Sequence, residues 1–294
     1  MKLKSGTVGY VELIATSIIW GVTYVLMKYS LSFLDPQQIA FSRFLIAALM
    51  FVPVLFLTHE KYGRGELLTL VILALTGVLL YQLLFIWGED GLTAANASFI
   101  VSFEPIFIVV LGISLKRDKI SWTVSTGLIL STIGMVILLK PTALAQSEVV
   151  SAILVLLSAL SWAIFTIVGK DLLEKHNPLN VTGYVTIIGL LMLLPFVNFG
   201  ALALFSLTNI YLIIALLFIG ILATFAGYFL WFDGLKKVRP VTAGTTLYIT
   251  PFVTVIFASM LISEPISIAT IVGGSVILVG LAVTGIRLRS IQSR

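Results

Sequence analysis

The sequence predicts an all-α integral membrane protein in which ten transmembrane helices form two inverted five-helix repeats. Hydrophobic residues make up 59% of its 294 residues and charged residues 11%, whereas a soluble domain carries roughly 25% charged residues. The hydrophobic residues gather in runs of about 20, the length that an α-helix needs to cross a bilayer. The second half of the chain also repeats the residue order of the first. Composition, span length and repetition together predict this fold class.

The boundaries of the predicted spans come from charged, capping and helix-breaking residues between the apolar runs. The uncharged stretch 177–232 is too long for one helix, and the break around Asn198 divides it into two. The ten predicted spans cover residues 8–28, 37–57, 66–87, 93–114, 120–139, 149–169, 180–199, 209–231, 240–262 and 266–286.

The distribution of Lys and Arg in the short loops predicts the orientation of the chain, because cytoplasmic loops carry an excess of these residues. With the N-terminus inside, nearly all of them fall on the cytoplasmic side. Lys28 and Lys140 fall outside, and Arg43 lies within the second span. We therefore predict a multipass protein of the plasma (inner) membrane with both termini in the cytoplasm.

An internal repeat divides the chain into residues 1–142 and 147–294, which we predict to form one structural unit. The segment from Trp20 to Lys28 resembles the segment from Trp162 to Lys170. The segments 77–92 and 220–235 align and both end in Asp-Gly-Leu, and prolines recur at equivalent places in the fourth and ninth spans. The order and spacing of these features persist over nearly the whole of each half.

Each predicted repeat has an odd number of helices, so the second repeat enters the membrane from the opposite side. Lys28 then ends its span on the outer side, whereas its counterpart Lys170 ends its span on the inner side. Inverted repeats of this kind place a substrate site near the membrane midplane, at the interface between the halves. The architecture therefore predicts a secondary transporter that works by alternating access.

With these features the chain resembles the EamA family of the drug/metabolite transporter superfamily over nearly its whole length. The resemblance rests on the Trp20–Lys28 segment and its repeat, the Asp-Gly-Leu segments and the two prolines. It implies export or exchange of small metabolites such as amino acids. It also implies a lumen lined mainly by helices 1, 3, 4, 6, 8 and 9, with helices 5 and 10 at the periphery. One departure is Asp118, where the family usually has a glutamate, as at Glu264.

Aromatic and polar side chains on the helices that the resemblance places around the lumen are the candidate substrate-binding residues. One face of the first span carries Trp20, Thr23, Tyr24 and Met27. The predicted substrate-binding residues are Trp20, Tyr24, Tyr81, Gln82, Phe85, Asn96, Trp162, Thr166, Thr224, Tyr228, Thr245 and Tyr248. Aromatic rings with a few hydrogen-bonding groups suit a small amphipathic solute. The alternative is that the hydroxyl groups bond neighbouring helices and the Trp and Tyr rings mark the membrane interface.

Glu104 and Arg43 are ionisable residues within predicted spans. A charge near the bilayer centre is costly, so each should face a cavity or a partner. Pro105 follows Glu104 and cannot donate to the Val101 carbonyl, which loosens the helix there. Two interpretations stay open: Glu104 takes up a coupling proton or cation, or it forms a permanent ion pair with Arg43. Arg43 in turn either binds a substrate carboxylate or only orients its helix.

The sequence lacks the residues on which several other kinds of site depend. It contains no cysteine, and its two histidines, His59 and His176, fall in separate predicted loops. We predict no catalytic residues, no metal and no cofactor. The expected partners are a small-molecule substrate, the lipid bilayer and a coupling proton or cation. The basic residues follow the membrane topology, so no nucleic acid is expected.

The predicted function is export of a small metabolite, an amino acid or a related amphipathic compound. Exchange of larger activated metabolites such as sugar nucleotides is an alternative, but few basic residues belong to the predicted lumen. A membrane enzyme acting on lipids could use Glu104 and Arg43, but no further acid, base or metal ligand accompanies them. A non-transporting scaffold or sensor is the remaining alternative.

Cysteine labelling can test the predicted topology, because the chain has no native cysteine. We expect tags at the N-terminus, near Arg64, near Lys237 and at the C-terminus to be reached only from the cytoplasm. We expect a cysteine introduced near Ala203 to react with a membrane-impermeant thiol reagent added to intact cells. Protection of that cysteine from the external reagent would contradict the ten-helix topology.

Overall fold

The structure is a computed structural model, and it describes residues 5–58, 60–115, 122–139, 146–197 and 209–292. These ranges contain helices and turns but no strand. The α-helices are α1 Ser5–Ser30, α2 Pro36–Thr58, α3 Arg64–Ala74, α4 Tyr81–Asp90, α5 Ala94–Val101, α6 Glu104–Ser114, α7 Trp122–Leu139, α8 Gln146–Leu173, α9 Pro178–Leu193, α10 Ile210–Leu217, α11 Gly227–Lys237, α12 Pro240–Thr246, α13 Thr250–Leu261 and α14 Ile268–Gln292. Leu75–Leu80 and Phe218–Ala226 are π-helical, and Leu194–Phe196 and Leu247–Ile249 are 3₁₀-helical.

The lengths and composition of the helices confirm the predicted fold class. Eight helical segments of the described chain are long and apolar enough to cross a membrane: Ser5–Ser30, Pro36–Thr58, Arg64–Asp90, Ala94–Gly112, Ser147–Leu173, Pro178–Phe196, Ile210–Lys237 and Thr242–Leu261. Two shorter apolar segments, Ser125–Gly134 in α7 and Ile268–Gly280 in α14, complete the set. Each corresponds to one predicted span. The predicted break around Asn198 lies outside the described residues.

Several helices extend further than the sequence predicted. α8 continues past Lys170 to Leu173, α11 continues to Lys237, and α4 continues to Asp90. The predicted spans ended before the first charged residue. In α8 and α11 a basic residue in the last turn interacts favourably with the carbonyl end of the helix, so it does not by itself end the helix. The last residues of α4 are acidic, and Lys28 from α1 binds the carbonyl end of that helix instead.

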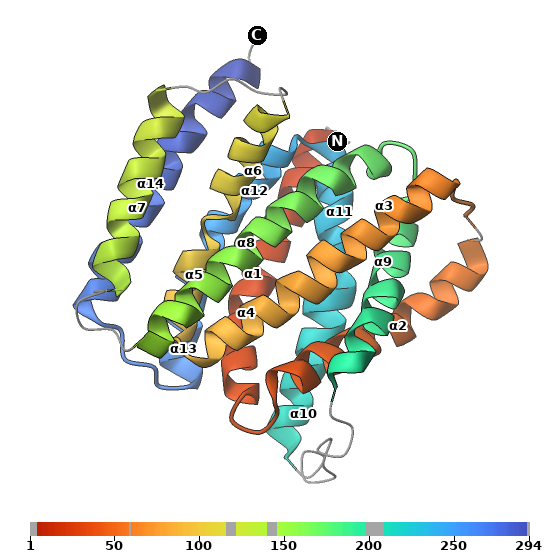
Figure 1. The fold of residues 1–294 in the computed structure, drawn as a ribbon, viewed down its shortest axis with the longest axis horizontal. Helices are drawn as coiled ribbons and strands as arrows, with labels where there is room; N and C mark the ends of the chain where they lie inside the picture. Colours follow the sequence, from red (N-terminus) through yellow and green to blue (C-terminus); the bar gives the residue numbers. More distant parts are fainter. Residues whose placement is uncertain (1–4, 59, 116–121, 140–145, 198–208, 293–294) are drawn as a thin grey trace.

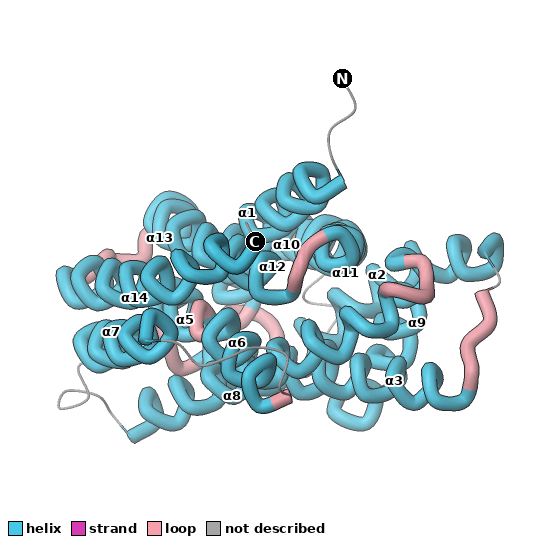
Figure 2. Tube along the Cα trace, turned by 90° about the horizontal axis from the view of Figure 1, so that it is seen from above, coloured by secondary structure: helices cyan, strands magenta, loops and turns pink. Residues whose placement is uncertain are grey.

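The helices form a bundle with one peripheral pair. α7 and α14 lie side by side at one edge of the molecule, where the resemblance placed helices 5 and 10 (Figures 1 and 2). Glycines permit this close approach: a Cβ added to Gly134 would lie 2.6 Å from the backbone N of Ile277. Both termini lie at the same end of the bundle (Figure 1), which we call the terminal end.

Each half contains a π-helical segment at the same point of its third helix. Leu75–Leu80 separates α3 from α4, and Phe218–Ala226 separates α10 from α11. The aligned glycines Gly77 and Gly220 lie in these segments. π-Helical turns are rare and occur frequently at functional sites. Their presence at equivalent positions shows that the repeat extends to local backbone geometry.

The fourth helix of each half is interrupted directly before a proline. α5 and α6 are separated by a turn just before Glu104-Pro105, and a 3₁₀ turn separates α12 from α13 just before Thr250-Pro251. Proline has no N–H to donate to the carbonyl four residues earlier, so a regular helix cannot continue through it. Both interruptions lie within membrane-spanning segments.

Two lysines at equivalent positions of the repeat bind the carbonyl ends of helices. Lys28 Nζ donates hydrogen bonds to the carbonyl oxygens of Glu89 (2.9 Å) and Asp90 (2.8 Å) at the end of α4. Lys170 Nζ does the same at the end of α11. Its acceptors are the carbonyl oxygens of Leu235 (2.9 Å), Lys236 (3.0 Å) and Val238 (3.1 Å). In each half the positive charge joins the first helix to the end of the third.

Replacing either lysine with methionine should destabilise the fold. We expect Lys28→Met and Lys170→Met each to lower the free energy of unfolding by about 1.5–3 kcal/mol, as for hydrogen bonds to charged groups. The measurement is the Tm of the purified protein. Lys175→Met is the matched control, because that side chain is 70% exposed and lies 3.7 Å from Glu66; surface ion pairs of this kind contribute little. If Lys28→Met and Lys170→Met have the same Tm as the wild type and the control, the two lysines do not stabilise the helix ends.

Candidate substrate cavity

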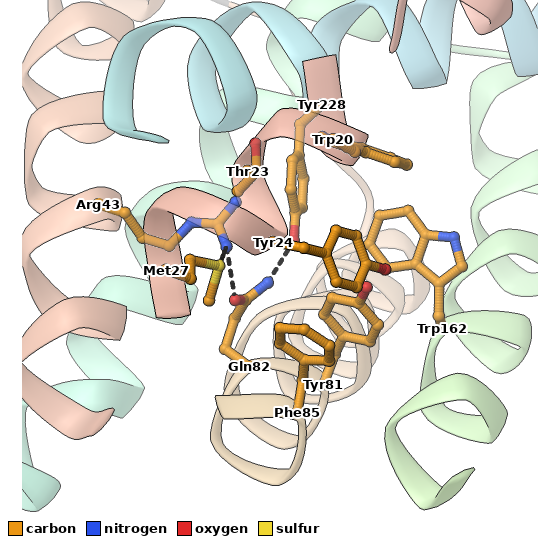
Figure 3. Close-up of a pocket in the computed structure, with 10 residues that line it drawn as sticks. All are labelled: Trp20, Thr23, Tyr24, Met27, Arg43, Tyr81, Gln82, Phe85, Trp162 and Tyr228. Atoms are coloured by element: carbon orange, nitrogen blue, oxygen red, sulfur yellow. Dashed lines mark hydrogen bonds between the residues drawn. The ribbon is translucent and has the colours of Figure 1, made fainter. Parts of the chain in front are cut away.

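A small internal cavity lies where α1, α2, α4, α8 and α11 meet (Figure 3). Its volume is about 30 Å³, which holds one or two water molecules but no metabolite. The lining residues are Trp20, Thr23, Tyr24, Met27, Arg43, Tyr81, Gln82, Phe85, Trp162 and Tyr228. They come from both halves of the chain. A larger solute could occupy this place only after the surrounding helices move.

A chain of hydrogen bonds from Arg43 crosses the cavity and joins the two halves. Arg43 is 4% exposed. Its Nε donates to Thr224 Oγ1 and its Nη1 to Gln82 Oε1, each at 2.8 Å. Gln82 Nε2 donates to the hydroxyl of Tyr228 at 3.0 Å (Figure 3). That hydroxyl donates to the Gly77 carbonyl, also at 3.0 Å. Neutral partners thus hold the buried guanidinium, which would be costly without hydrogen bonds.

The π-helical segments accept hydrogen bonds from the opposite half. Trp20 Nε1, from the first half, donates to the Ala223 carbonyl at 2.9 Å. Ser161 Oγ, from the second half, donates to the Thr76 carbonyl at 2.7 Å. Together with the Gly77 carbonyl, these contacts place irregular backbone of both halves beside the cavity. Irregular backbone at membrane depth is tolerated where it is buried in protein or lines a cavity.

Aromatic rings form the side of the cavity away from Arg43 (Figure 3). The Trp20 and Trp162 rings meet edge to face with centroids 5.1 Å apart, and Tyr24 and Phe85 do so at 5.0 Å. The Tyr81 ring lies 4.8 Å from that of Trp162. Edge-to-face contacts are a preferred geometry for aromatic pairs. The cavity therefore has one polar, cationic side and one aromatic side.

Glu104 lies beside the cavity rather than in its lining. Its side chain is 2% exposed and interacts with Tyr81. Its Oε1 has no hydrogen-bond partner in the described part of the chain. Glu104 forms no ion pair with Arg43 in this structure, because the neutral oxygens of Gln82 and Thr224 accept the guanidinium donors instead. The two charged residues thus have separate surroundings.

The other predicted substrate-binding residues do not line the cavity. Thr224 lies outside the lining and accepts a hydrogen bond from the guanidinium of Arg43. The Thr166 hydroxyl is buried without a partner among the described residues. Thr245 Oγ1 bonds a carbonyl of its own helix at 2.8 Å. The Asn96 side chain accepts a hydrogen bond from α14 at 3.4 Å, and Tyr248 packs against the hydrophobic core. Most of these contacts fit the helix-packing alternative.

At the terminal end, an ion pair and a side-chain hydrogen bond join the two halves. Lys237 Nζ lies 2.6 Å from Glu12 Oε1, and His176 Nδ1 lies 3.0 Å from Glu60 Oε1. Burial would raise the pKa of the Glu60 carboxyl. Hydrogen bonds from Asn180, His176 and the backbone outweigh burial and hold that pKa below its usual value.

At the opposite end, hydrogen bonds join the halves. The backbone N–H of Ala94 donates to Glu264 Oε2 at 3.2 Å, and Asn209 Nδ2 donates to the Tyr29 hydroxyl at 3.4 Å. Both ends of the interface are therefore bridged, which agrees with the small volume of the cavity between them.

The sequence did not reveal Glu89 as a buried acidic residue. The predicted span ended at residue 87, which placed Glu89 in a loop, whereas α4 includes it and its side chain is 0% exposed. The aligned position in the second half is Phe232, a buried aromatic residue. Glu89 could have been identified from the repeat, because its aligned position in the second half is occupied by an aromatic residue.

Comparisons with known proteins agree with this architecture. The model of the EamA-like transporter family matches residues 7–140 and 149–286. An uncharacterized transporter of Archaeoglobus fulgidus is 30% identical, over 92% of this chain and 96% of its own. A probable amino-acid metabolite efflux pump of Salmonella typhimurium is 25% identical, over 96% of each chain. One crystal structure shares the fold with a TM-score of 0.70 at 17% identity and covers 98% of both chains.

The apolar helices and the family match together define a polytopic membrane transporter. The family match covers nearly the whole chain, and the protein belongs to the EamA-like transporter family.

Removing the Tyr228 hydroxyl should weaken the contact between the halves. Tyr228→Phe keeps the ring but leaves the Gln82 amide and the Gly77 carbonyl without this partner. We expect a loss of about 1–3 kcal/mol in the free energy of unfolding, the cost of buried unsatisfied groups. Tyr211→Phe is the control and should change nothing, because Tyr211 is 73% exposed. If chemical denaturation finds both variants equally stable, the Tyr228 hydroxyl does not stabilise the contact between the halves.

Proposed function

We propose that this protein exports a small amphipathic metabolite, an amino acid or a related compound, across the plasma membrane by alternating access. The observation that carries the proposal is the cavity between the halves, where one buried guanidinium faces a group of aromatic rings. Both termini lie in the cytoplasm in this proposal, as the loop charges favour.

The chemistry of the cavity supports an amino-acid-like substrate. A guanidinium binds a carboxylate through two parallel hydrogen bonds, and a charged acceptor is stronger than the neutral oxygens of Gln82 and Thr224. The aromatic side of the cavity suits an apolar substrate side chain. Arg43 carries the only charge among the residues that line the cavity, which matches a substrate with one carboxylate.

The closed cavity corresponds to a substrate-free state in the proposed cycle. The substrate enters when the cytoplasmic end opens, which requires Lys237 to separate from Glu12. It leaves when the outer end opens, which requires Glu264 to separate from Ala94. Each of these contacts joins one half to the other, so rocking of the halves would break them alternately.

The alternatives have less support. The name of the Salmonella typhimurium relative supports an amino-acid metabolite as the substrate class. A sugar nucleotide carries several negative charges, for which the cavity lining offers one cation. A membrane enzyme would need an acid–base group at the cavity, and the lining residues include neither a carboxylate nor a histidine.

Glu104 is the proposed coupling group. It interacts with Tyr81, which lines the cavity, so a change in the hydration of the cavity would reach it. It also begins α6 directly after the interruption of the helix, where a change of helix direction is least costly. Intramembrane carboxylates in such positions often form proton relays.

Counterflow into liposomes that contain the purified protein tests the transport proposal. Vesicles loaded with one unlabelled amino acid at a time should accumulate the same labelled amino acid from outside. Tyr81→Ala should reduce this accumulation more than it lowers the yield of folded protein. Equal losses of both would favour a packing role for Tyr81. If no amino acid of a broad panel shows counterflow but a nucleotide sugar does, the exchanger alternative is favoured.

The coupling role predicts a specific transport defect. Glu104→Gln should abolish the dependence of transport on a pH gradient while exchange stays measurable. The hydrogen bonds of Arg43 should stay intact, because the two side chains form no ion pair. The double variant Glu104→Gln/Arg43→Gln should therefore not recover driven transport. Recovery of both stability and driven transport in the double variant would indicate an ion pair and rule out the coupling role.

A further inference from the structure

Glu89 is a buried carboxyl group that the proposed transport cycle does not use. It lies in the last turn of α4 and is 0% exposed. Neither of its carboxyl oxygens has a hydrogen-bond partner among the residues that the structure describes. An ionised carboxylate without donors and away from water is very costly, so such a group either gains a partner or becomes neutral.

Ionisable groups from several parts of the chain act on Glu89, but the two cations among them donate their hydrogen bonds to other groups. Lys28 on α1, Glu264 after α13, Arg43 on α2 and the adjacent Asp90 all act on it electrostatically. Lys28 Nζ donates to the backbone carbonyls of Glu89 and Asp90. The guanidinium of Arg43 donates to the neutral side-chain oxygens of Thr224 and Gln82. Neither cation neutralises the carboxyl group by direct contact.

Glu264 brings a second carboxyl group to the same place from the other half. Its Oε2 accepts the Ala94 backbone N–H at 3.2 Å, and its Oε1 is buried without a partner in the described chain. A neighbouring negative charge disfavours ionisation of a carboxyl group. Glu264 acts electrostatically on Glu89 across the interface between the halves.

We propose that Glu89 is a proton-binding site at the outer end of the interface between the halves and that Glu264 controls its affinity for the proton. A proton fits the ligand set better than a metal ion, because the described residues contain no group of three or more His, Asp or Glu side chains that could hold one. In the closed structure the bound proton removes the charge that burial disfavours.

The site deepens the transport proposal and depends on it for its physiological role. Opening of the outer end would carry Glu264 away with the second half and let water reach Glu89, whose carboxyl group could then exchange its proton with the outside. Closing would return Glu264 and retain the proton. Tyr24, in the cavity lining, interacts electrostatically with both Glu89 and Glu104. Tyr24 therefore connects the outer site electrostatically with the proposed coupling group.

Infrared spectroscopy of the whole protein in lipid vesicles tests the site without any transport measurement. A protonated carboxyl group has a C=O stretching band that the carboxylate lacks. At neutral pH the wild type should show such a band that is missing from Glu89→Gln and retained in the control Glu174→Gln, whose side chain is exposed. In Glu264→Gln, raising the pH should remove the band earlier, because the like charge no longer opposes ionisation.

Two results would overturn the proposal. One is the absence of any difference between wild type and Glu89→Gln in this band. The other is a Glu89→Gln protein that fails to fold, because glutamine has the size and neutrality of the protonated acid. Counterflow in the same vesicles separates the two proposals: a Glu89 band without counterflow of any amino acid would refute the proposed substrate class and leave the proton site standing.

Discussion

The fold depends on keeping one buried guanidinium hydrogen-bonded inside an apolar bundle. Arg43 meets this requirement with Gln82 from its own half and Thr224 from the other. A charged donor without partners at this depth would be very costly. α2, α4 and the π-helical segment of the second half must therefore keep their register around it. In the proposed cycle, a carboxylate ligand would replace these neutral partners and so change how firmly the halves are joined.

Regular and irregular backbone have distinct places in the bundle. The carbonyl ends of α4 and α11 are fixed by Lys28 and Lys170, whereas the interruptions lie in the middle of the spans. The π-helical carbonyls of Gly77 and Ala223 accept side-chain donors from the opposite half beside the cavity. In the proposed cycle, helices with fixed ends and irregular middles could change direction around a ligand, and irregular backbone at this depth is tolerated because it is buried in protein.

The sequence predicted the architecture well because hydrophobic length and repetition are local or linear signals. Trp20, Tyr81 and Tyr228 were selected because the family resemblance places their helices around the lumen, and the structure brings them together. The sequence could not predict that Lys28 binds the end of α4, because its acceptors are backbone carbonyls far along the chain. Glu89 was missed because a charge at a predicted helix end is indistinguishable from a loop charge until packing shows its burial.

The two aligned tryptophans differ in one bond. Trp20 Nε1 donates to the Ala223 carbonyl, whereas Trp162 Nε1 has no partner among the described residues. The repeat aligns Ala223 with Leu80. If the halves exchanged conformations, the indole of Trp20 would be released and that of Trp162 would gain the Leu80 carbonyl. In the proposed cycle, the two states would then differ in which of the two indoles is hydrogen-bonded.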